Sequence, residues 1–277
     1  MKSLKTVDLS FGVLYVAAGP EFVEEAVASA RSLRASNPHV PVAIFTDQDV
    51  GQYHAIFDIV RPILDPRRDS NDKIQGIAGT PFQKTVFIDT DTRILRDISD
   101  LKLLLDRFDI AFAFDPIRSD QEQPSIPDCF PTFNSGMLAY KRSEKTAKLF
   151  KDWLHAFRTQ PDEPGKTRRD QPPFRKVMWE SDLRYAVLPE EYNLRVIFEH
   201  MVGGNAYIKV LHGRHDLLEK AMEYAETIHF FPRVYGRRYS VGEILRMLVS
   251  RIYERVGLRL GWDVRGERKR TGQTWKY

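Results

Sequence analysis

Short apolar runs rich in β-branched residues alternate along the chain with stretches in which apolar residues recur every three or four positions. This alternation is typical of an α/β fold with a mixed, mostly parallel sheet flanked by helices. The expected strands are residues 12–18, 42–46, 57–60, 85–88, 110–114, 135–140 and 207–211. The expected helices are 21–35, 72–78, one capped by Ser99, one capped by Ser143, and one opened by Asp170-Gln171.

Charge divides the 277 residues into two parts near residue 232. Residues 233–277 carry twelve Lys and Arg against four Asp and Glu, whereas residues 1–232 carry 30 against 34. Apolar residues at helical spacing from Val241 to Val256 predict a basic amphipathic helix within residues 233–277. We therefore expect an α/β domain over 1–232 and a helical extension over 233–277, which either packs on the domain or binds an anionic membrane surface.

Several classes of protein are disfavoured by the sequence. No apolar run approaches the roughly 20 residues of a membrane span, and the run that ends at Ala18 is closed by Gly19-Pro20, as expected for a strand and not for a signal peptide. The single cysteine, Cys129, cannot form an intramolecular disulfide, which favours a cytoplasmic location, with peripheral binding to the inner face of a membrane as a possible addition. No recognised nucleic-acid-binding motif is present, and the body is acidic, so no nucleic-acid partner is expected. A glycine-rich dinucleotide or Walker sequence is also absent.

The strongest motif is Asp89-Thr90-Asp91, which follows the apolar run 85–88. Ligands of open α/β sheets bind beyond the carboxyl ends of the strands, and two carboxylates there can share a hard divalent cation. The alternative without metal binding is a purely structural one, in which Asp89 caps the next turn and Asp91 is solvated. A competing enzyme class, the haloacid-dehalogenase-type phosphatases, would use Asp89 as a nucleophile, but these enzymes place Thr or Val where this chain has Arg93.

This motif is one of six that occur in a fixed order along the chain. They are Lys73, Asp89-Thr90-Asp91, Phe133-Asn134-Ser135-Gly136, Asp170-Gln171, Leu188-Pro189-x-x-Tyr192-Asn193 and His212-Gly213. In this order and spacing, the chain resembles the GT-A glycosyltransferases, and most of all the glycogenin and galactosyltransferase group known as family 8. The resemblance covers residues 11–215 and includes a Lys sixteen positions before the first Asp of the D-x-D.

The resemblance implies a metal-dependent, retaining transferase that uses a nucleotide-diphosphate sugar, usually a UDP-sugar, and a bound Mn²⁺ or Mg²⁺. It assigns the metal to Asp89, Asp91 and His212, and places Asp170 and Gln171 beside the reacting sugar carbon as catalytic residues. The implied donor-binding residues are Lys73, Asp89, Thr90, Asp91, Asn134, Ser135, Asn193 and Gly213. The implied acceptor is a glycan or a lipid-linked sugar.

Each matched residue also has an ordinary structural interpretation. Lys73 would be a solvated helix lysine, Asn134 would form a turn at the start of a strand, and Asp170 would be a plain N-cap. His212 alone would be a packed or capping histidine. The sequence also departs from the family, because Arg214 and His215 stand where the family continues towards a phosphate-binding Lys. A binding protein of the same fold without turnover remains an alternative.

Overall fold

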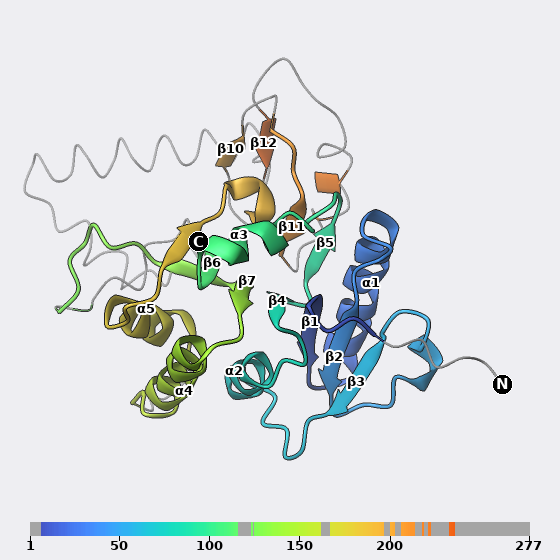
Figure 1. The fold of residues 1–277 in the computed structure, drawn as a ribbon, viewed down its shortest axis with the longest axis horizontal. Coiled ribbons are helices and arrows are strands. Elements are labelled where there is room, and N and C mark those ends of the chain that lie inside the picture. Colours follow the sequence, from blue (N-terminus) through green and yellow to red (C-terminus); the bar gives the residue numbers. More distant parts are fainter. Residues whose placement is uncertain are drawn as a thin grey trace, which may run out of the picture. The chain divides into compact units, whose positions relative to one another are not determined.

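A seven-stranded mixed sheet forms the centre of the computed structural model (Figure 1). The structure describes residues 7–115, 123, 125–161, 167–196, 200–202, 206–213, 218, 221–222 and 233–235. In spatial order the strands are β3 (Ile59–Pro62), β2 (Val42–Thr46), β1 (Phe11–Ala17), β4 (Lys84–Ile88), β7 (Phe133–Lys141), β6 (Ile110–Phe114) and β8 (Tyr185–Val187). All neighbours pair in parallel except β7, which runs antiparallel to both β4 and β6.

Helices cover both faces of this sheet (Figure 1). The helices are α1 (Pro20–Ser36), α2 (Ser70–Ala78), α3 (Leu101–Arg107), α4 (Glu144–Arg158) and α5 (Gln171–Trp179), with short 3₁₀ turns at Gly51–Tyr53 and Glu190–Tyr192. Helices α1 and α3 pack on one face, where alternate residues of β1 such as Val13 and Tyr15 point. Helices α2, α4 and α5 pack on the other face against Leu14 and Phe87, around the fully buried Trp153.

Two smaller sheets stand beside the main one. Strands β5 (Thr92–Ile94), β11 (Val210–His212) and β9 (Leu194–Arg195) form a three-stranded sheet, in which β11 is central. Strands β10 (His200–Val202) and β12 (Arg233–Tyr235) form an antiparallel pair. Contacts divide the chain into Met1–Gly236 and Arg237–Tyr277, and the second part, which holds nearly all of the predicted basic extension, lies outside the described residues.

The predicted strands and helices of the main sheet are confirmed, with shifts of a few residues at their ends. The Ser143 cap is confirmed, because the Ser143 hydroxyl accepts from the Thr146 backbone N–H in a capping box. The predicted Ser99 cap is wrong: α3 has Asp100 at its N-cap position, and the Ser99 hydroxyl donates to Asp97 at 2.9 Å. The short strands β5, β8, β9, β10 and β12 escaped prediction because two or three residues are too few to show a period.

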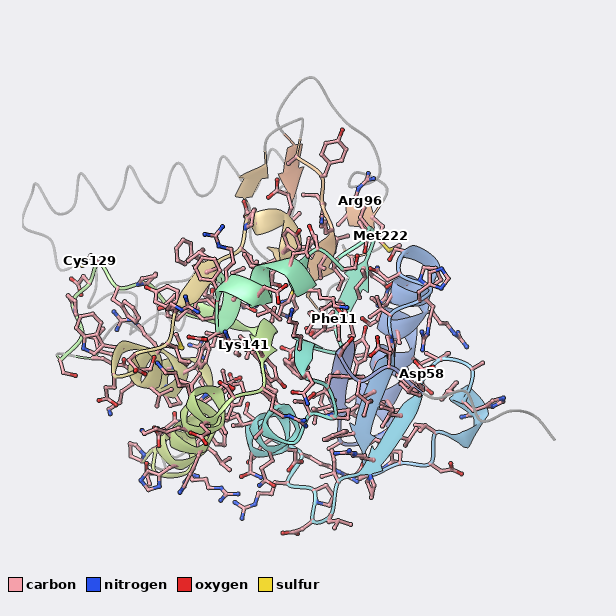
Figure 2. The ribbon with its side chains drawn as sticks, in the orientation of Figure 1. Phe11, Asp58, Arg96, Cys129, Lys141 and Met222 are labelled. Atoms are coloured by element: carbon pink, nitrogen blue, oxygen red, sulfur yellow. The ribbon has the colours of Figure 1, made fainter. Side chains whose placement is uncertain are left out.

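Polar contacts stabilise the edge of the sheet at β3. The Asp58 carboxylate, just before β3, accepts from the guanidinium of Arg34 on α1 and from the Val42 backbone N–H, and Figure 2 labels Asp58 beside that edge.

The single cysteine, Cys129, is exposed on the loop that precedes β7, at the left of Figure 2. Among the helices that are described, none is both long enough and apolar enough to cross a bilayer.

The reversed direction of β7 determines where polar residues gather. Because β4 and β6 run antiparallel to β7, their carboxyl ends lie beside the residues that open β7. Asp89 follows β4, Asp115 follows β6, and Asn134 and Ser135 are near the start of β7. Residues from three strands that are distant in sequence therefore meet at one edge of the sheet, where ligands of α/β folds bind.

Candidate active site

Three predicted metal ligands converge at this edge. One ligand atom each from Asp89, Asp91 and His212 lies within 4.8 Å of the other two. The His212 Nε2 atom lies 3.4 Å from Asp91 Oδ1 and 3.9 Å from Asp89 Oδ2. Two carboxylate oxygens and one imidazole nitrogen form a donor set that suits Mn²⁺, and carboxylates also suit Mg²⁺. The residues present therefore fit a divalent cation, and the predicted cluster exists.

Two glycines, Gly136 and Gly213, allow the backbone to lie close to this cluster. A Cβ added to Gly136 would lie 2.2 Å from His212 Cε1 and 2.8 Å from Asp89 Oδ2, so no larger residue fits against the cluster. Gly213 has φ of 145°, a conformation that favours glycine, and its backbone N–H donates to the Asp91 carbonyl at 2.8 Å. This bond ties the end of β11 to the D-x-D turn.

Lys73 joins the predicted metal site to the predicted catalytic carboxylate. From α2, its ammonium lies 3.0 Å from Asp89 Oδ1 and 3.1 Å from Asp170 Oδ2, and it donates to the Ser135 hydroxyl at 3.1 Å. Ser135 in turn donates to Asp170 Oδ2 at 2.7 Å. Only 16% of the Lys73 side chain is exposed, so the solvated-lysine interpretation is wrong.

Charge pairing shifts the titration of these groups. Burial lowers the pKa of Lys73, but the carboxylates of Asp170 and Asp89 more than offset this, and the net pKa is raised. Burial alone would raise the pKa of Asp170, yet Lys73 and the Ser135 hydroxyl lower it below the ordinary value. Burial raises the pKa of Asp89 despite Lys73, with Asp91 adding a like charge. A cation that binds Asp89 must therefore compete with the Lys73 ammonium, which lies 3.0 Å from Asp89 Oδ1.

Replacing Lys73 with methionine should destabilise the fold, because it leaves two partly buried carboxylates without their cation. We expect a loss of about 3 kcal/mol in the free energy of unfolding, measured in urea. Lys148→Met, which removes an exposed ion pair with Asp152, is the control and should change stability little. Equal effects of the two substitutions would show that Lys73 contributes no more than a surface lysine.

Asp170 and Gln171 enter different networks. Asp170 occupies the N-cap position of α5, but its carboxylate makes no cap hydrogen bond and turns instead to Lys73 and Ser135, so the plain N-cap interpretation is wrong. The Gln171 amide donates to Asp115 Oδ2, and to the Phe133 carbonyl at 3.3 Å. The two neighbours therefore contact different partners: Asp170 contacts Lys73 and Ser135, and Gln171 contacts Asp115 and Phe133.

Asp115 and Arg195 are polar residues of the site that the predicted set lacks. Asp115 is buried, accepts from Gln171 and from Asn134 Nδ2 at 3.5 Å, and lies 3.7 Å from the Arg195 guanidinium. Its position at the end of a strand was a usable signal, whereas nothing in the sequence distinguished Arg195. A cavity of about 230 Å³ adjoins them, lined by Ala113, Phe114, Leu188, Glu190, Asn193 and Arg195.

The predicted donor-binding residues Asn134 and Asn193 are hydrogen-bonded to each other, and Asn193 also contacts His212. Asn134 Oδ1 accepts from the Gly136 backbone N–H at 2.9 Å, which is the predicted turn at the start of the strand, and from Asn193 Nδ2 at 2.9 Å. Asn193 Oδ1 lies 2.8 Å from His212 Nδ1. Asn134, Asn193 and His212 are each at most 4% exposed. The remaining predicted residue, Thr90, is buried and donates to Glu25 on α1 at 2.7 Å.

The buried hydroxyls of Tyr15, Ser29 and Thr92 form a series of hydrogen bonds that ends at the backbone of the D-x-D turn. Tyr15 OH lies 3.0 Å from Ser29 Oγ, Ser29 Oγ lies 2.6 Å from Thr92 Oγ1, and Thr92 donates to the Asp89 carbonyl at 2.9 Å. Burial raises the pKa of Tyr15, so its phenol stays protonated and can donate. The main-chain position of Asp89 is thus fixed through β1, α1 and β5. Arg214 and His215, expected near the donor phosphates, lie outside the described residues.

Comparison with solved structures assigns the fold. GlyE of Streptococcus pneumoniae TIGR4, described as a glycosyltransferase, superposes with a TM-score of 0.54 at 15% identity, over 79% of this chain and 60% of GlyE. The galactosyltransferase LgtC, in complex with donor and acceptor sugar analogues, superposes with a TM-score of 0.52 at 11% identity, over 80% of this chain and 98% of LgtC. The chain has a glycosyltransferase fold. No protein-family profile matches the sequence, and no curated protein matches it.

The glycosyltransferase fold confirms the predicted GT-A architecture. WbbM, a bifunctional glycosyltransferase, adds a TM-score of 0.53 at 14% identity, over 79% of this chain and 50% of WbbM. The chain spans only about 60% of the length of GlyE. Asp89 and Asp91 follow β4 at the carboxyl edge of the sheet, where ligands of open α/β sheets bind.

Proposed function

We propose that this protein is a metal-dependent, retaining glycosyltransferase that moves a hexose from a nucleotide-diphosphate sugar, with UDP-sugars foremost, to a hydroxyl of a glycan or a lipid-linked acceptor. The observation that carries the proposal is the convergence of Asp89, Asp91 and His212 at the carboxyl edge of a glycosyltransferase fold. The likeness to the family 8 enzymes in motif order supports the same assignment. The fold gives no support to the phosphatase alternative.

Charge is the chemical problem in this reaction. The leaving nucleotide diphosphate carries negative charge as the glycosidic bond breaks, and a divalent cation, Mn²⁺ or Mg²⁺, would neutralise that charge as a Lewis acid. Asp89, Asp91 and His212 are the residues that would hold it. Positive charge that develops on the sugar ring needs an anion nearby, and the ionised Asp170 supplies one.

Asp170 suits electrostatic stabilisation better than nucleophilic attack. Its two side-chain hydrogen bonds, from Lys73 and Ser135, both fall on Oδ2, and its lowered pKa marks a weak base. A route on one face of the sugar, in which the leaving phosphate oxygen accepts the acceptor's proton, needs no protein nucleophile. Gln171 then orients the sugar through its amide oxygen, because its NH₂ group already donates to Asp115 and to the Phe133 carbonyl. The cavity beside Arg195 is our candidate for the acceptor.

Incubation with UDP-sugars, Mn²⁺ and simple glycan acceptors tests the proposal directly. We expect UDP release that requires the metal, together with a product that keeps the donor's anomeric configuration. Binding of UDP-sugar without release, across a broad set of acceptors, would favour the non-catalytic alternative. A product of inverted configuration would overturn the retaining assignment alone.

Removing residues 237–277, which form most of the basic extension, should separate catalysis from binding to an anionic membrane. This segment carries eleven Lys and Arg against four Asp and Glu, and each basic residue near an anionic bilayer contributes about 1 kcal/mol. The chain ending at Gly236, which keeps β12, should stay folded and transfer sugar to a soluble acceptor, but lose sedimentation with anionic vesicles. Neutral vesicles are the control. Unfolding of the shortened chain would instead indicate that the extension packs on the domain.

A further inference from the structure

Three hydrogen bonds in series lead from the backbone of β7 to the ring of His212. The Gly136 N–H donates to Asn134 Oδ1 at 2.9 Å, and Asn193 Nδ2 donates to the same oxygen at 2.9 Å. Asn193 Oδ1 then lies 2.8 Å from His212 Nδ1. The series joins β7 to the end of the 3₁₀ turn Glu190–Tyr192 and to β11. Every side chain in it is buried.

The Gly136 backbone N–H, the first donor in the series, determines the orientation of each side chain that follows it. Oxygen and nitrogen of an amide have nearly the same outline, so the orientation of an asparagine follows from its partners. A backbone N–H can only donate, and therefore the atom of Asn134 that faces Gly136 is its oxygen. That oxygen can only accept, so Asn193 turns its NH₂ group to Asn134. The Asn193 oxygen is then left for His212, whose Nδ1 must carry the proton.

The other end of Asn134 agrees with this orientation. Its Nδ2 lies 3.5 Å from Asp115 Oδ2, a carboxylate oxygen that accepts. Turning Asn134 over would place its oxygen against that carboxylate and its NH₂ against the Gly136 N–H. Both contacts would be repulsive in a buried site, where water cannot replace the lost partners.

The consequence lies at the opposite nitrogen of the ring. A neutral imidazole has one N–H, and with that proton on Nδ1 the Nε2 atom keeps its lone pair. Nε2 is the atom that faces the D-x-D carboxylates, at 3.4 Å from Asp91 Oδ1. The other tautomer would present an N–H at this point and could not bind a cation there.

We propose that Asn193, oriented by Asn134, is a positioning residue that holds His212 in the Nδ1–H tautomer and so keeps Nε2 ready for a divalent cation. The inference rests on the proposed function, since the cation belongs to it. It gives the two asparagines a role that differs from contact with the donor sugar. Metal-bound histidines commonly donate their second ring N–H to an acceptor, and here that acceptor is itself oriented by a neighbour.

Nitrogen NMR of the metal-free protein, with ¹⁵N-labelled histidine and at a pH where the ring is neutral, tests the tautomer. Wild-type His212 should show a protonated Nδ1 and an unprotonated Nε2. In Asn134→Ala, the Asn193 amide loses the partner that orients it, and the Nε2–H form should become populated although the ring's direct partner is intact. A wild-type ring protonated on Nε2, or a tautomer unaffected by Asn134→Ala, would overturn the proposal.

Calorimetric titration with Mn²⁺ tests the consequence. Asn193→Leu should weaken the binding by about 10- to 100-fold, the usual effect of losing such a partner. Asn37→Leu is the control, because Asn37 is equally buried and also makes side-chain hydrogen bonds, to the Arg96 carbonyl and from the Ile98 N–H, and neither partner is a predicted metal ligand. It should lower stability but leave the Mn²⁺ affinity unchanged.

The two experiments separate this inference from the proposed function. If the wild-type protein binds neither Mn²⁺ nor Mg²⁺, the metal dependence fails, while the NMR result still decides the tautomer. If the wild-type protein binds Mn²⁺ and Asn193→Leu binds it equally well while remaining folded, the positioning role is overturned and the metal site stands.

Discussion

Asp91→Ala should abolish Mn²⁺-dependent turnover of UDP-sugars and leave the fold intact. The substitution removes one of the two carboxylates that face His212, and the loss of a metal-bound carboxylate costs several kcal/mol of transition-state stabilisation, or about 10³-fold or more in rate. The fold should survive because Asp91 lies at the edge of the sheet. Its carbonyl, which accepts from the Gly213 N–H, is also unchanged by the substitution.

UDP release and Mn²⁺ titration, measured on the same preparation, check this expectation. Asp182→Ala is a suitable control, because Asp182 is an exposed carboxylate that pairs with Lys145 on the surface. Circular dichroism and the unfolding midpoint of both variants should match those of the wild-type protein. A folded Asp91→Ala protein with near-normal turnover would refute the assignment of the metal to this cluster.

Asp170→Asn should slow transfer by about 10²- to 10³-fold, with no covalent sugar on the enzyme. Asparagine keeps the shape of the side chain, and the Asp170 carbonyl still accepts from the Trp153 indole, so the start of α5 should stay in place. What is lost is the negative charge that we propose to lie beside the reacting sugar, and the size of the effect is that of lost electrostatic stabilisation.

Rate measurements at saturating donor, together with mass spectrometry after incubation with a fluorinated donor, check both parts of this prediction. Ser143→Ala is a control for damage to a helix start, because it removes the cap of α4 without touching the site. It should lower stability and spare the rate. A sugar adduct trapped on Asp170 would replace the single-face route by a covalent one.

Much of the main sheet could be predicted because its strands are apolar and its helices amphipathic over many residues. Strands such as β2 and β4 are buried on both faces, and such strands give continuous apolar runs. The helix Glu144–Arg158 was recognisable from its cap and from its apolar residues at helical spacing. The reversal of β7 could not be predicted, because an apolar run shows that a strand is buried but not in which direction it runs in the sheet.

The composition of the site was easier to predict than its connections. The order of motifs indicated Asp89, Asp91 and His212, and their side chains are indeed close together. Nothing local indicated that Lys73 would bridge Asp89 and Asp170, since that contact depends on the fold bringing three segments distant in sequence together. Hydrogen bonds between residues 59 or more positions apart, such as that from Asn193 to Asn134, are properties of the fold and not of any motif.

The buried hydroxyls of Tyr15, Ser29 and Thr92 matter to anyone who would redesign this protein. Each hydroxyl has one proton, and the last must go to the Asp89 carbonyl, so the whole series points one way and each donor is already used. A library that varies α1 to improve solubility or stability should therefore leave Ser29 unchanged. Alanine at that position would leave the buried Tyr15 hydroxyl without its partner, at a cost of about 1–3 kcal/mol, and would remove the hydrogen bond that holds the Thr92 hydroxyl beside the D-x-D turn.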